Sequence, residues 1–360
     1  MEKLRIGIIG TGGISNSHVK AYQQMEDVEI VAGADIVPGK AREALDRWNL
    51  PQAKAFENTQ EMLDTMELDA VSVCTYNTAH AECAIQALRA GCHVLLEKPM
   101  TVTLEDAQAV RRVEKETGKI LTIGYQNRFR KEAMYLKDLA DQDYFGEIYY
   151  AEAIAIRRRA VPTWGVFIDE EKQGGGPLID IGTHALDLTL FAMNNYEPAY
   201  CVGKTYHKLN KQTGTGNAWG DWDTEKFTAE DSAFGFVVMK NGATINLRSS
   251  WALNYANPLE AATTVCGDKA GAELTWDRLR VNGVMNGRQY ILEPDFKTGG
   301  VAFFDGAGAT DAPGLEAICF TNAIQGKGNL YVTAEQAACV TRILEGIYES
   351  QKTGKPYYFD

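Results

Sequence analysis

The stretch LRIGIIGTGGIS, residues 4–15, decides the expected fold of this chain. Its first six residues form a short apolar run of the kind found in buried strands. The glycine-rich turn that follows leads into a helical pattern that continues to about Gln24. A strand, a glycine turn and a helix in this order open a βαβ unit, so we expect the chain to begin with a parallel sheet.

Three further apolar runs extend this pattern, namely EIVAGAD at 29–35, AVSVCT at 70–75 and HVLLEK at 93–98. Segments of helix length separate the runs, such as AHAECAIQALRA at 79–90. Strands that alternate with helices favour an α/β fold with a doubly wound parallel sheet. We therefore expect a first domain over residues 1–125.

The character of the sequence changes after residue 125, where strand-like alternation becomes clearer and the connections become longer. The run FGFVVMKNGATINLRSSW, residues 234–251, carries an Asn-Gly pair between two strand-like halves, which is a strong hairpin signal. An α+β domain with a mainly antiparallel sheet is therefore expected over residues 126–360. The tail from Thr333 to Gly354 predicts a closing helix.

Composition limits the class of protein. The chain has 360 residues, 45% of them hydrophobic, and its 36 basic and 48 acidic side chains give a net charge of −12. A negative chain without a basic run disfavours nucleic acid and anionic membrane as partners. No apolar stretch reaches the length of a membrane span, and the seven cysteines show no metal-ligand spacing. We expect a cytoplasmic protein without a bound metal.

The glycine turn also carries a candidate function. Gly10, Gly12 and the small Ser15 form a GxGxxS version of the dinucleotide fingerprint, in which glycines permit a sharp turn and close approach to a diphosphate. Asp35 ends the next expected strand, where its carboxylate would bind ribose hydroxyls and repel a 2′-phosphate. NAD is therefore predicted over NADP. Lys40, like Arg42 beside it, weakens this discrimination.

A second stretch, GGGPLIDIGTHALDL at 174–188, places three glycines and a proline before an expected helix. At about 100° per residue, Asp180, His184 and Asp187 share one narrow arc, while apolar residues form a separate stripe. We interpret the polar arc as a functional face. The glycines would let the backbone pass close to a substrate or cofactor.

Lys98, in LLEKP, follows an expected parallel strand at the edge where open α/β sheets bind ligands. At this point the sequence resembles the Gfo/Idh/MocA family, named for glucose-fructose oxidoreductase and inositol dehydrogenase. The motifs that carry the resemblance are GTGGIS at 10–15, CTYNTAH at 74–80, EKP at 97–99, GGGPLIDIGTHALD at 174–187 and TAEQA at 333–337. Tyr76 stands where the family usually has proline, and Ser15 where it has alanine or glycine.

The resemblance implies a Rossmann domain followed by a domain with a large open sheet, and a catalytic set of Lys98, Asp180 and His184. Family members mostly oxidise or reduce a secondary alcohol on a sugar, a polyol or a sugar-like ring. The cofactor-binding positions that it implies are Gly10, Thr11, Gly12, Gly13, Ile14, Asp35, Thr75, Asn77, His80, Glu97, Lys98 and Gln126.

Alcohol oxidation explains why such a set is needed. The nicotinamide accepts a hydride from carbon, so the protein must supply a base for the hydroxyl proton. His184 is our predicted base, because imidazole titrates near neutral pH. Lys98 is the alternative base if burial beside the nicotinamide lowers its pKa, and the sequence leaves this choice open. Asp180 would bond a substrate hydroxyl.

Candidate substrate-binding residues combine aromatic faces with polar groups, as hydroxylated rings require. They are Lys98, Tyr125, Asn127, Arg128, Arg157, Arg158, Trp164, Asp180 and His184. The run AWGDWD at 218–223 is interpreted as a pocket loop or an oligomer contact.

The predicted function is an NAD-dependent oxidoreductase that acts on a secondary ring hydroxyl of a sugar, glycoside or cyclic polyol, with a 3-keto sugar as one product. The alternatives are an inositol dehydrogenase and an NAD-dependent glycosidase that uses transient oxidation. A non-catalytic NAD-binding sensor is disfavoured by the intact set at 98, 180 and 184. We expect a homodimer or homotetramer formed through the sheet of the second domain.

Overall fold

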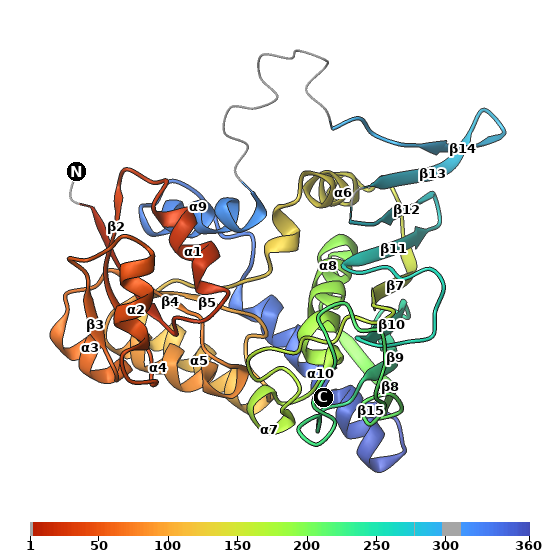
Figure 1. The fold of residues 1–360 in the computed structure, drawn as a ribbon. Coiled ribbons are helices and arrows are strands. Elements are labelled where there is room, and N and C mark those ends of the chain that lie inside the picture. Colours follow the sequence, from red (N-terminus) through yellow and green to blue (C-terminus); the bar gives the residue numbers. More distant parts are fainter. Residues whose placement is uncertain (1–2, 277, 297–310) are drawn as a thin grey trace. The chain divides into compact units, whose positions relative to one another are not determined.

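The computed structural model describes residues 3–276, 278–296 and 311–360 and divides into two compact units. The first unit comprises Met1–Gln126 and Thr310–Ala338, and the second comprises Asn127–Ala309 and Cys339–Asp360. Figure 1 shows a sheet with helices in each unit. The two are described separately below.

The first unit contains the predicted parallel sheet. Its six strands lie in the order β3-β2-β1-β4-β5-β6, and their recorded pairings are parallel. The order reverses at β1, which makes the C-terminal ends of β1 and β4 a switch point where ligands bind in such sheets. The strands are β1 Leu4–Ile9, β2 Val28–Ala34, β3 Lys54–Phe56, β4 Ala70–Val73, β5 His93–Leu96 and β6 Leu121–Ile123.

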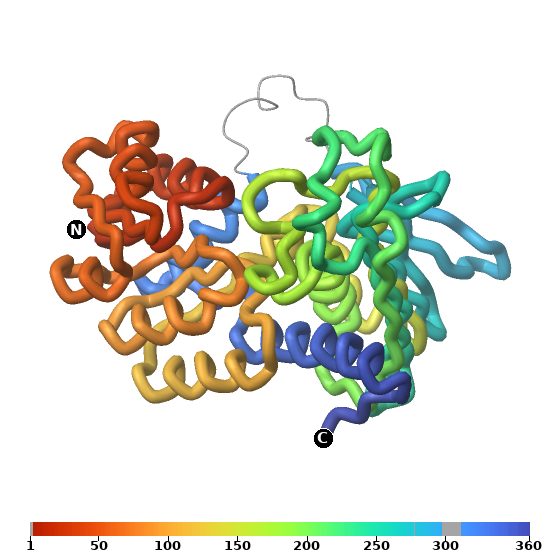
Figure 2. Tube along the Cα trace, turned by 60° about the horizontal axis from the view of Figure 1, so that its bottom comes forward, coloured from red at the N-terminus to blue at the C-terminus, as the bar shows by residue number. Residues whose placement is uncertain are grey.

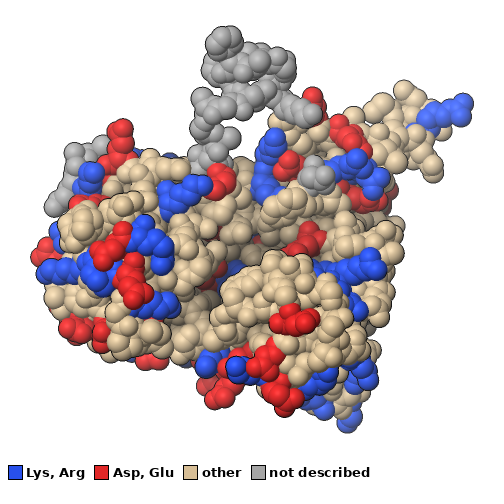
Figure 3. Space-filling model, viewed as in Figure 1, with Lys and Arg blue, Asp and Glu red and all other residues tan. Residues whose placement is uncertain are grey.

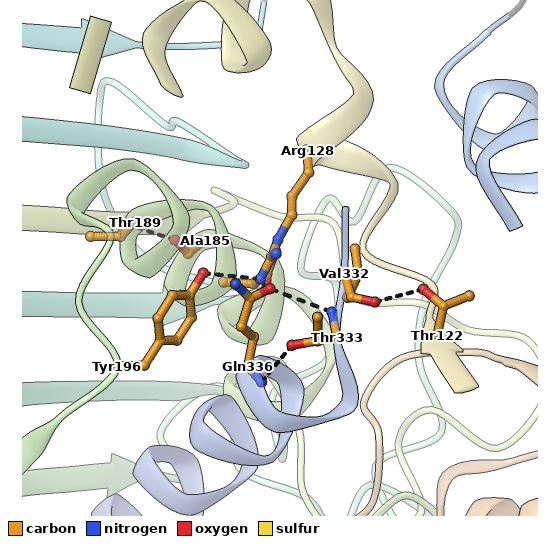
Figure 4. A network of polar contacts seen from close by, with 9 residues as sticks. Thr122, Arg128, Ala185, Thr189, Tyr196, Val332, Thr333 and Gln336 are labelled. Atoms are coloured by element: carbon orange, nitrogen blue, oxygen red, sulfur yellow. Dashed lines mark hydrogen bonds and ion pairs between the residues drawn. The ribbon is translucent and has the colours of Figure 1, made fainter. Parts of the chain in front are cut away.

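Helices connect these strands and bury their apolar sides against the sheet. They are α1 Ser15–Tyr22, α2 Lys40–Arg47, α3 Thr59–Thr65, α4 His80–Arg89 and α5 Leu104–Thr117. A helix from much later in the chain, α9 Ala312–Ile324, completes the unit, because its Phe320 lies in the same buried cluster as Ile6 and Val19. The Thr122 hydroxyl of β6 donates a hydrogen bond to the carbonyl of Val332 at 2.9 Å (Figure 4). Residues 311–338 therefore close the first unit.

The second unit contains a nine-stranded sheet in the order β14-β13-β12-β11-β7-β10-β9-β8-β15. The recorded pairs are antiparallel except β10 with β7, which confirms a mainly antiparallel sheet. The predicted Asn-Gly hairpin joins β9 to β10. The strands are β7 Ile148–Ile156, β8 Pro198–Tyr206, β9 Ser232–Met239, β10 Thr244–Ser250, β11 Ala262–Gly267, β12 Ala270–Leu274, β13 Leu279–Met285, β14 Arg288–Leu292 and β15 Tyr357–Tyr358.

Helices cover one face of this sheet. Helix α8, Thr183–Met193, packs on β7 and β11. The predicted closing helix is α10, Ala334–Thr353, which is drawn in blue near the C-terminus in Figure 2. Ile347 of α10 fits against Gly203 and Gly235, where a Cβ would lie within 2.4 Å and 2.6 Å of its side chain. Alternation along the strands directs Val202 and Phe236 to the other face, where they are 43% and 39% exposed.

Two shorter helices complete the second unit, α6 at Lys131–Asp141 and α7 at Glu170–Gln173. Figure 3 shows basic and acidic side chains interspersed over the visible surface. Among the described residues, no helix combines the length and apolar character that a membrane span requires.

Candidate active site

The predicted cofactor residues of the first unit gather at one edge of its sheet. They follow the C-terminal ends of five strands that run in the same direction. Gly10–Ile14 follow β1, Asp35 follows β2, Thr75, Asn77 and His80 follow β4, Glu97 and Lys98 follow β5, and Tyr125 and Gln126 follow β6.

The glycine loop after β1 has room for a ligand. Gly10 has a φ of +84°, and a Cβ there would lie 2.6 Å from the carbonyl oxygen of Cys74, so only glycine fits. At Gly12 and Gly13, by contrast, a Cβ would meet no atom within 4 Å. The Ser15 hydroxyl donates to the carbonyl of Gly12 at 2.6 Å and so holds the turn. An open loop at the start of α1 fits a diphosphate.

Asp35 is held in place at the end of β2 by several donors. Its Oδ2 accepts hydrogen bonds from the Thr11 amide at 2.9 Å and hydroxyl at 2.8 Å, and it pairs with Lys40 Nζ at 2.9 Å. Burial raises the pKa of Asp35, but Lys40 and the other donors outweigh burial and leave the pKa lowered. Arg42 instead donates to the carbonyls of Ala53 and Leu50. Lys40 is therefore the cation that faces this carboxylate.

A buried polar chain lies behind Lys98. Glu97 Oε2 accepts the Lys98 amide at 3.1 Å, and Glu97 Oε1 lies 2.9 Å from His18 Nε2. His18 Nδ1 lies 3.1 Å from the Ser72 hydroxyl, which is also 2.8 Å from the Tyr22 hydroxyl. Burial raises the pKa of Glu97, but the hydrogen bond and charge of His18 and the neighbouring Lys98 leave it lowered. Glu97 therefore supports the Lys98 backbone from within the protein.

His80 joins two loops of this edge. Its Nδ1 lies 2.7 Å from the Pro99 carbonyl oxygen and its Nε2 lies 3.2 Å from that of Thr75. Burial lowers the pKa of His80, which favours the neutral ring. The side chain thus connects the loop after β4 to the loop after β5. Tyr76, which departs from the family pattern, is 36% exposed in the first of these loops.

In the second unit, the stretch that carries Asp180 and His184 begins differently from our prediction. A single α-helix is wrong for its first turn, because Leu178–Gly182 form a π-helix that continues into α8. A π turn changes the angle between successive side chains, so the predicted arc does not hold. Asp187 lies in the protein interior at 1% exposure, which contradicts its placement on a functional face with Asp180 and His184.

Arg128 is the partner of Asp187. The guanidinium donates through Nε to Oδ2 at 2.9 Å and through Nη2 to Oδ1 at 2.6 Å. Nη2 also donates to the Tyr196 hydroxyl at 3.3 Å (Figure 4). Burial raises the pKa of Asp187 more than Arg128 lowers it. Arg128 is fully buried, so the structure gives this substrate-binding candidate a structural role.

Asp180 has a defined orientation within the second unit. Its Oδ2 accepts a hydrogen bond from Trp251 Nε1 at 2.9 Å, and Trp251 is fully buried. His184 is half-buried in the first turn of α8. Burial lowers the pKa of Arg157, but Glu260 and the charge of Asp180 raise it overall. The two candidates Asp180 and Arg157 therefore influence each other.

Arg157 and Trp164 belong to one surface cluster of the second unit. The rings of Trp164 and Trp219 meet edge to face with centroids 4.9 Å apart, and they are 52% and 44% exposed. The Arg157 guanidinium, paired with Glu260, lies 5.4 Å from the Trp219 ring centroid. The neighbouring candidate Arg158 is exposed. The sequence predicts that Trp219 belongs to a pocket loop or an oligomer contact at 218–223, but it does not identify Trp219 as a site residue.

The two substrate-binding candidates that flank Gln126 are enclosed by the protein. Tyr125 is fully buried and Asn127 is 6% exposed. Both flank Gln126, which begins the short helical turn Gln126–Phe129.

Two of the three glycines before the π-helix, Gly175 and Gly176, have a packing role. A Cβ at Gly175 would lie 2.1 Å from the Tyr348 hydroxyl oxygen, and one at Gly176 would lie 2.1 Å from the Glu230 carbonyl oxygen. The atoms that these two glycines approach most closely belong to Tyr348 and Glu230. No motif had pointed to Tyr348 or Glu230.

The first unit has a Rossmann sheet with an open glycine loop, and the second unit carries an oriented acid and a histidine. These features define a class of two-unit dinucleotide-binding oxidoreductases. Residues 4–125 match the model described as "Oxidoreductase family, NAD-binding Rossmann fold", and residues 133–273 match the GFO/IDH/MocA C-terminal domain. The chain belongs to the GFO/IDH/MocA oxidoreductase family. It is an oxidoreductase with NAD as its cofactor, as the sequence predicts.

Several relatives have names that state an activity. The chain is 33% identical over 354 residues to D-glucoside 3-dehydrogenase of Escherichia coli K12, covering 98% of this chain and 96% of that protein. It is 28% identical over 251 residues to glucose-6-phosphate 3-dehydrogenase of Bacillus subtilis 168, covering 68% and 67%. Levoglucosan dehydrogenase in complex with NADH and levoglucosan has the same fold, with a TM-score of 0.85, 19% identity and 99% coverage of both chains.

Proposed function

We propose that this protein is an NAD-dependent dehydrogenase that oxidises the 3-hydroxyl of a sugar or glycoside ring to a ketone. The observation that carries the proposal is the similarity to D-glucoside 3-dehydrogenase over nearly the full length of both chains. A second relative, glucose-6-phosphate 3-dehydrogenase, is also named for the 3-position. Lys98, Asp180 and His184 supply the acid-base groups that such a reaction needs.

The domain proposed for dinucleotide binding spans residues 1–125 and forms most of the first unit. When NAD is bound, it supplies the hydride acceptor. The open loop at Gly12 and Gly13 holds the diphosphate, and Asp35 binds the adenosine ribose. The other proposed cofactor contacts are Gly10, Thr11, Ile14, Thr75, Asn77, His80, Glu97, Lys98 and Gln126. Of these, Glu97 and His80 act mainly by holding the loops.

The domain proposed for substrate binding and oligomerisation spans residues 126–360, although residues 311–338 of this range pack with the first unit. His184 removes the proton from the substrate hydroxyl, while the C–H bond breaks and the C–O bond becomes a carbonyl. Lys98 donates a hydrogen bond to the reacting oxygen and stabilises its negative charge, and it is the alternative base. Asp180, oriented by Trp251, accepts a hydrogen bond from a neighbouring substrate hydroxyl.

The surface cluster around Trp164 binds the flat face of a sugar ring. An exposed indole pair with a guanidinium beside it offers the aromatic and polar contacts that carbohydrates use. Tyr125, Asn127, Arg157 and Arg158 complete the proposed substrate set.

The proposal is tested by incubating the pure protein with NAD and a panel of sugars, methyl glycosides and inositols. We expect NADH absorbance with glucosides and identification of a 3-keto product by NMR. No NADH with any glycoside, together with no reduction of a ketone acceptor added to the same mixture, would contradict the proposal. Release of an aglycone without NADH would instead support the NAD-dependent glycosidase.

An inositol dehydrogenase is the second candidate. The chain is 34% identical to inositol 2-dehydrogenase of Salmonella typhimurium LT2, although over 146 residues that cover 40% of this chain and 43% of that protein. A higher kcat/KM for inositols than for glucosides in the same panel would favour it. Unchanged biological effect of a Lys98→Ala variant would favour the non-catalytic sensor.

We also propose that the protein is a cytoplasmic homodimer or homotetramer formed through the exposed face of the nine-stranded sheet. Exposed apolar side chains such as Val202 and Phe236 on this face support the assembly. Light scattering at micromolar concentration should give a dimer or tetramer mass. A monomer mass would contradict the assembly without affecting the proposed reaction.

A further inference from the structure

The carboxyl group of Glu230, which the proposed reaction does not use, lies beside the N-terminal end of the π-helix Leu178–Gly182. Its Oε2 accepts a hydrogen bond from the Gly176 amide at 2.6 Å, and its Oε1 accepts one from the Leu178 amide at 3.2 Å. The first amides of a helix have no partners within it, and Pro177 at the N-cap provides no side-chain bond. Glu230 therefore caps this helix from just before a distant strand, β9.

Other contacts hold the same segment against the sheet. The Ser249 hydroxyl donates to the Pro177 carbonyl at 2.6 Å, and Trp251 Nε1 donates to Asp180 at 2.9 Å. Each of these partners lies near an end of β9 or β10. Residues 176–180 are thus fixed at several points, and Glu230 provides two of them.

Within the part of the chain that the structure describes, the hydrogen-bond donors to the Glu230 carboxyl group carry no positive charge. Besides the two amides, its recorded side-chain donor is the Tyr348 hydroxyl at 2.9 Å. Glu230 is 3% exposed, and burial raises its pKa to about 7 against the lowering effect of these donors. A buried carboxylate with neutral donors is costly, so Glu230 takes up a proton at a higher pH than an exposed glutamate does.

We propose that Glu230 is a positioning residue for the segment that carries Asp180 and His184, and that proton uptake by its carboxyl group tightens the hold on this segment. The functional part of this inference rests on the proposed function. The structural part depends only on contacts within the second unit.

The groups that face Glu230 come from three elements. Tyr348 approaches from α10, and Glu170 of α7 acts on Tyr348 through its charge. The segment 174–178 contributes glycines, proline and leucine, which do not titrate. Asp231, the next residue, directs its carboxylate to the amides of Leu209 and Asn210 instead. Glu230 is therefore the group whose protonation changes the capping of Gly176 and Leu178.

The sign of the effect follows from linkage. When the segment opens, water reaches Glu230 and its pKa returns toward the usual value of 4.5, whereas in the closed segment it is about 7. The closed form therefore binds the proton more tightly, and opening becomes easier as pH rises between these values. From pH 5 to pH 8 the opening equilibrium should increase roughly fiftyfold to a hundredfold.

Hydrogen exchange of the full chain measures this directly. After correction for the intrinsic pH dependence of exchange, peptides covering 174–182 should lose protection as pH rises and reach a plateau above about pH 7. Glu230→Gln, which resembles the protonated form, should stay protected at pH 8 and lose the pH step. Tyr348→Phe removes a donor to the carboxylate and should move the step to higher pH.

Asp231→Asn is the matched control, because it changes a neighbouring buried carboxylate that contacts other amides. It should leave the pH step of 174–182 in place. A wild-type segment without a pH step, or a step that persists unchanged in Glu230→Gln, would overturn the proposal. If Glu230→Gln does not fold, an unshifted step in Tyr348→Phe overturns it.

The kinetic part of this test requires that the protein catalyses the proposed reaction. In the wild type, opening of this segment should lower kcat above neutral pH, and the decrease should be smaller in Glu230→Gln, with the KM for NAD unchanged. An unchanged kcat profile beside a lost exchange step would refute the link to catalysis. Absence of NADH with every sugar would count against the proposed function, while the exchange data would still decide the role of Glu230.

Discussion

Two pairs of adjacent glycines in this protein, Gly12 with Gly13 and Gly175 with Gly176, have opposite surroundings. At Gly12 and Gly13 of the first unit a Cβ would meet empty space, whereas at Gly175 and Gly176 of the second unit it would lie 2.1 Å from protein atoms. In the first loop, glycine leaves room for a ligand. In the second stretch, glycine lets the backbone pack against Tyr348 and Glu230. The same residue type in two motifs of one family thus has two physical roles.

The charged candidates also differ between buried and exposed positions. We expect the largest effect on stability from replacing Arg128, which is held in the interior. Arg128→Ala leaves Asp187 buried without its cation, so we expect the free energy of unfolding to fall by about 4 kcal/mol. Chemical denaturation measures the loss. Full stability of the variant would show that Arg128 is available for another role.

The packed glycines should come next in size. Gly176→Ala places a methyl group against the Glu230 carbonyl, and we expect a loss of about 3 kcal/mol in the free energy of unfolding. Gly12→Ala is the matched control, and its stability should remain within about 0.5 kcal/mol of the wild type. Equal losses in the two variants would remove the distinction between the loops.

NAD affinity, unlike stability, should be more sensitive to a change in the loop at Gly12 than to one at Gly176. A larger side chain in Gly12→Val fills the space proposed for the diphosphate, so NAD affinity measured by calorimetry should decrease on the order of a hundredfold. The unfolding midpoint without NAD should change little. Wild-type NAD affinity in this variant would place the diphosphate elsewhere.

The smallest expected effect concerns cofactor choice. Lys40 pairs with Asp35 and is 42% exposed, so its replacement changes binding by no more than about 1 kcal/mol. Lys40→Ala should raise the ratio of NAD to NADP affinity several-fold, because the cation that offsets the Asp35 charge is removed. A lower ratio would mean that Lys40 helps NAD more than NADP.

The sequence predicts the first edge well because parallel strands end on the same side. Residues after β1, β2, β4 and β5 could be assigned to one edge without knowing any distance between them. The capping of the π-helix by Glu230 could not be predicted from the sequence in this way. Glu230 lies 54 residues from Gly176 and 118 from Tyr348, and no local pattern connects them.

Periodicity also has a limit at the π turn. An angle of about 100° per residue grouped Asp187 with Asp180 and His184, whereas the structure buries Asp187 against Arg128. Similarly, the alternation of strands and helices ends near residue 125, yet residues 311–338 return to the first unit. His18 lies on the buried side of α1, as Ser15 does, and no motif of the sequence points to it.

The central claim is that hydride passes from C3 of a glycoside ring to NAD. It is tested most directly with a methyl glucoside that carries deuterium only at C3. We predict that the deuterium appears in the NADH, that the sugar product is the 3-ketone, and that Lys98→Ala and His184→Ala abolish both. Unlabelled NADH, formed together with a ketone at another ring carbon, would contradict the account.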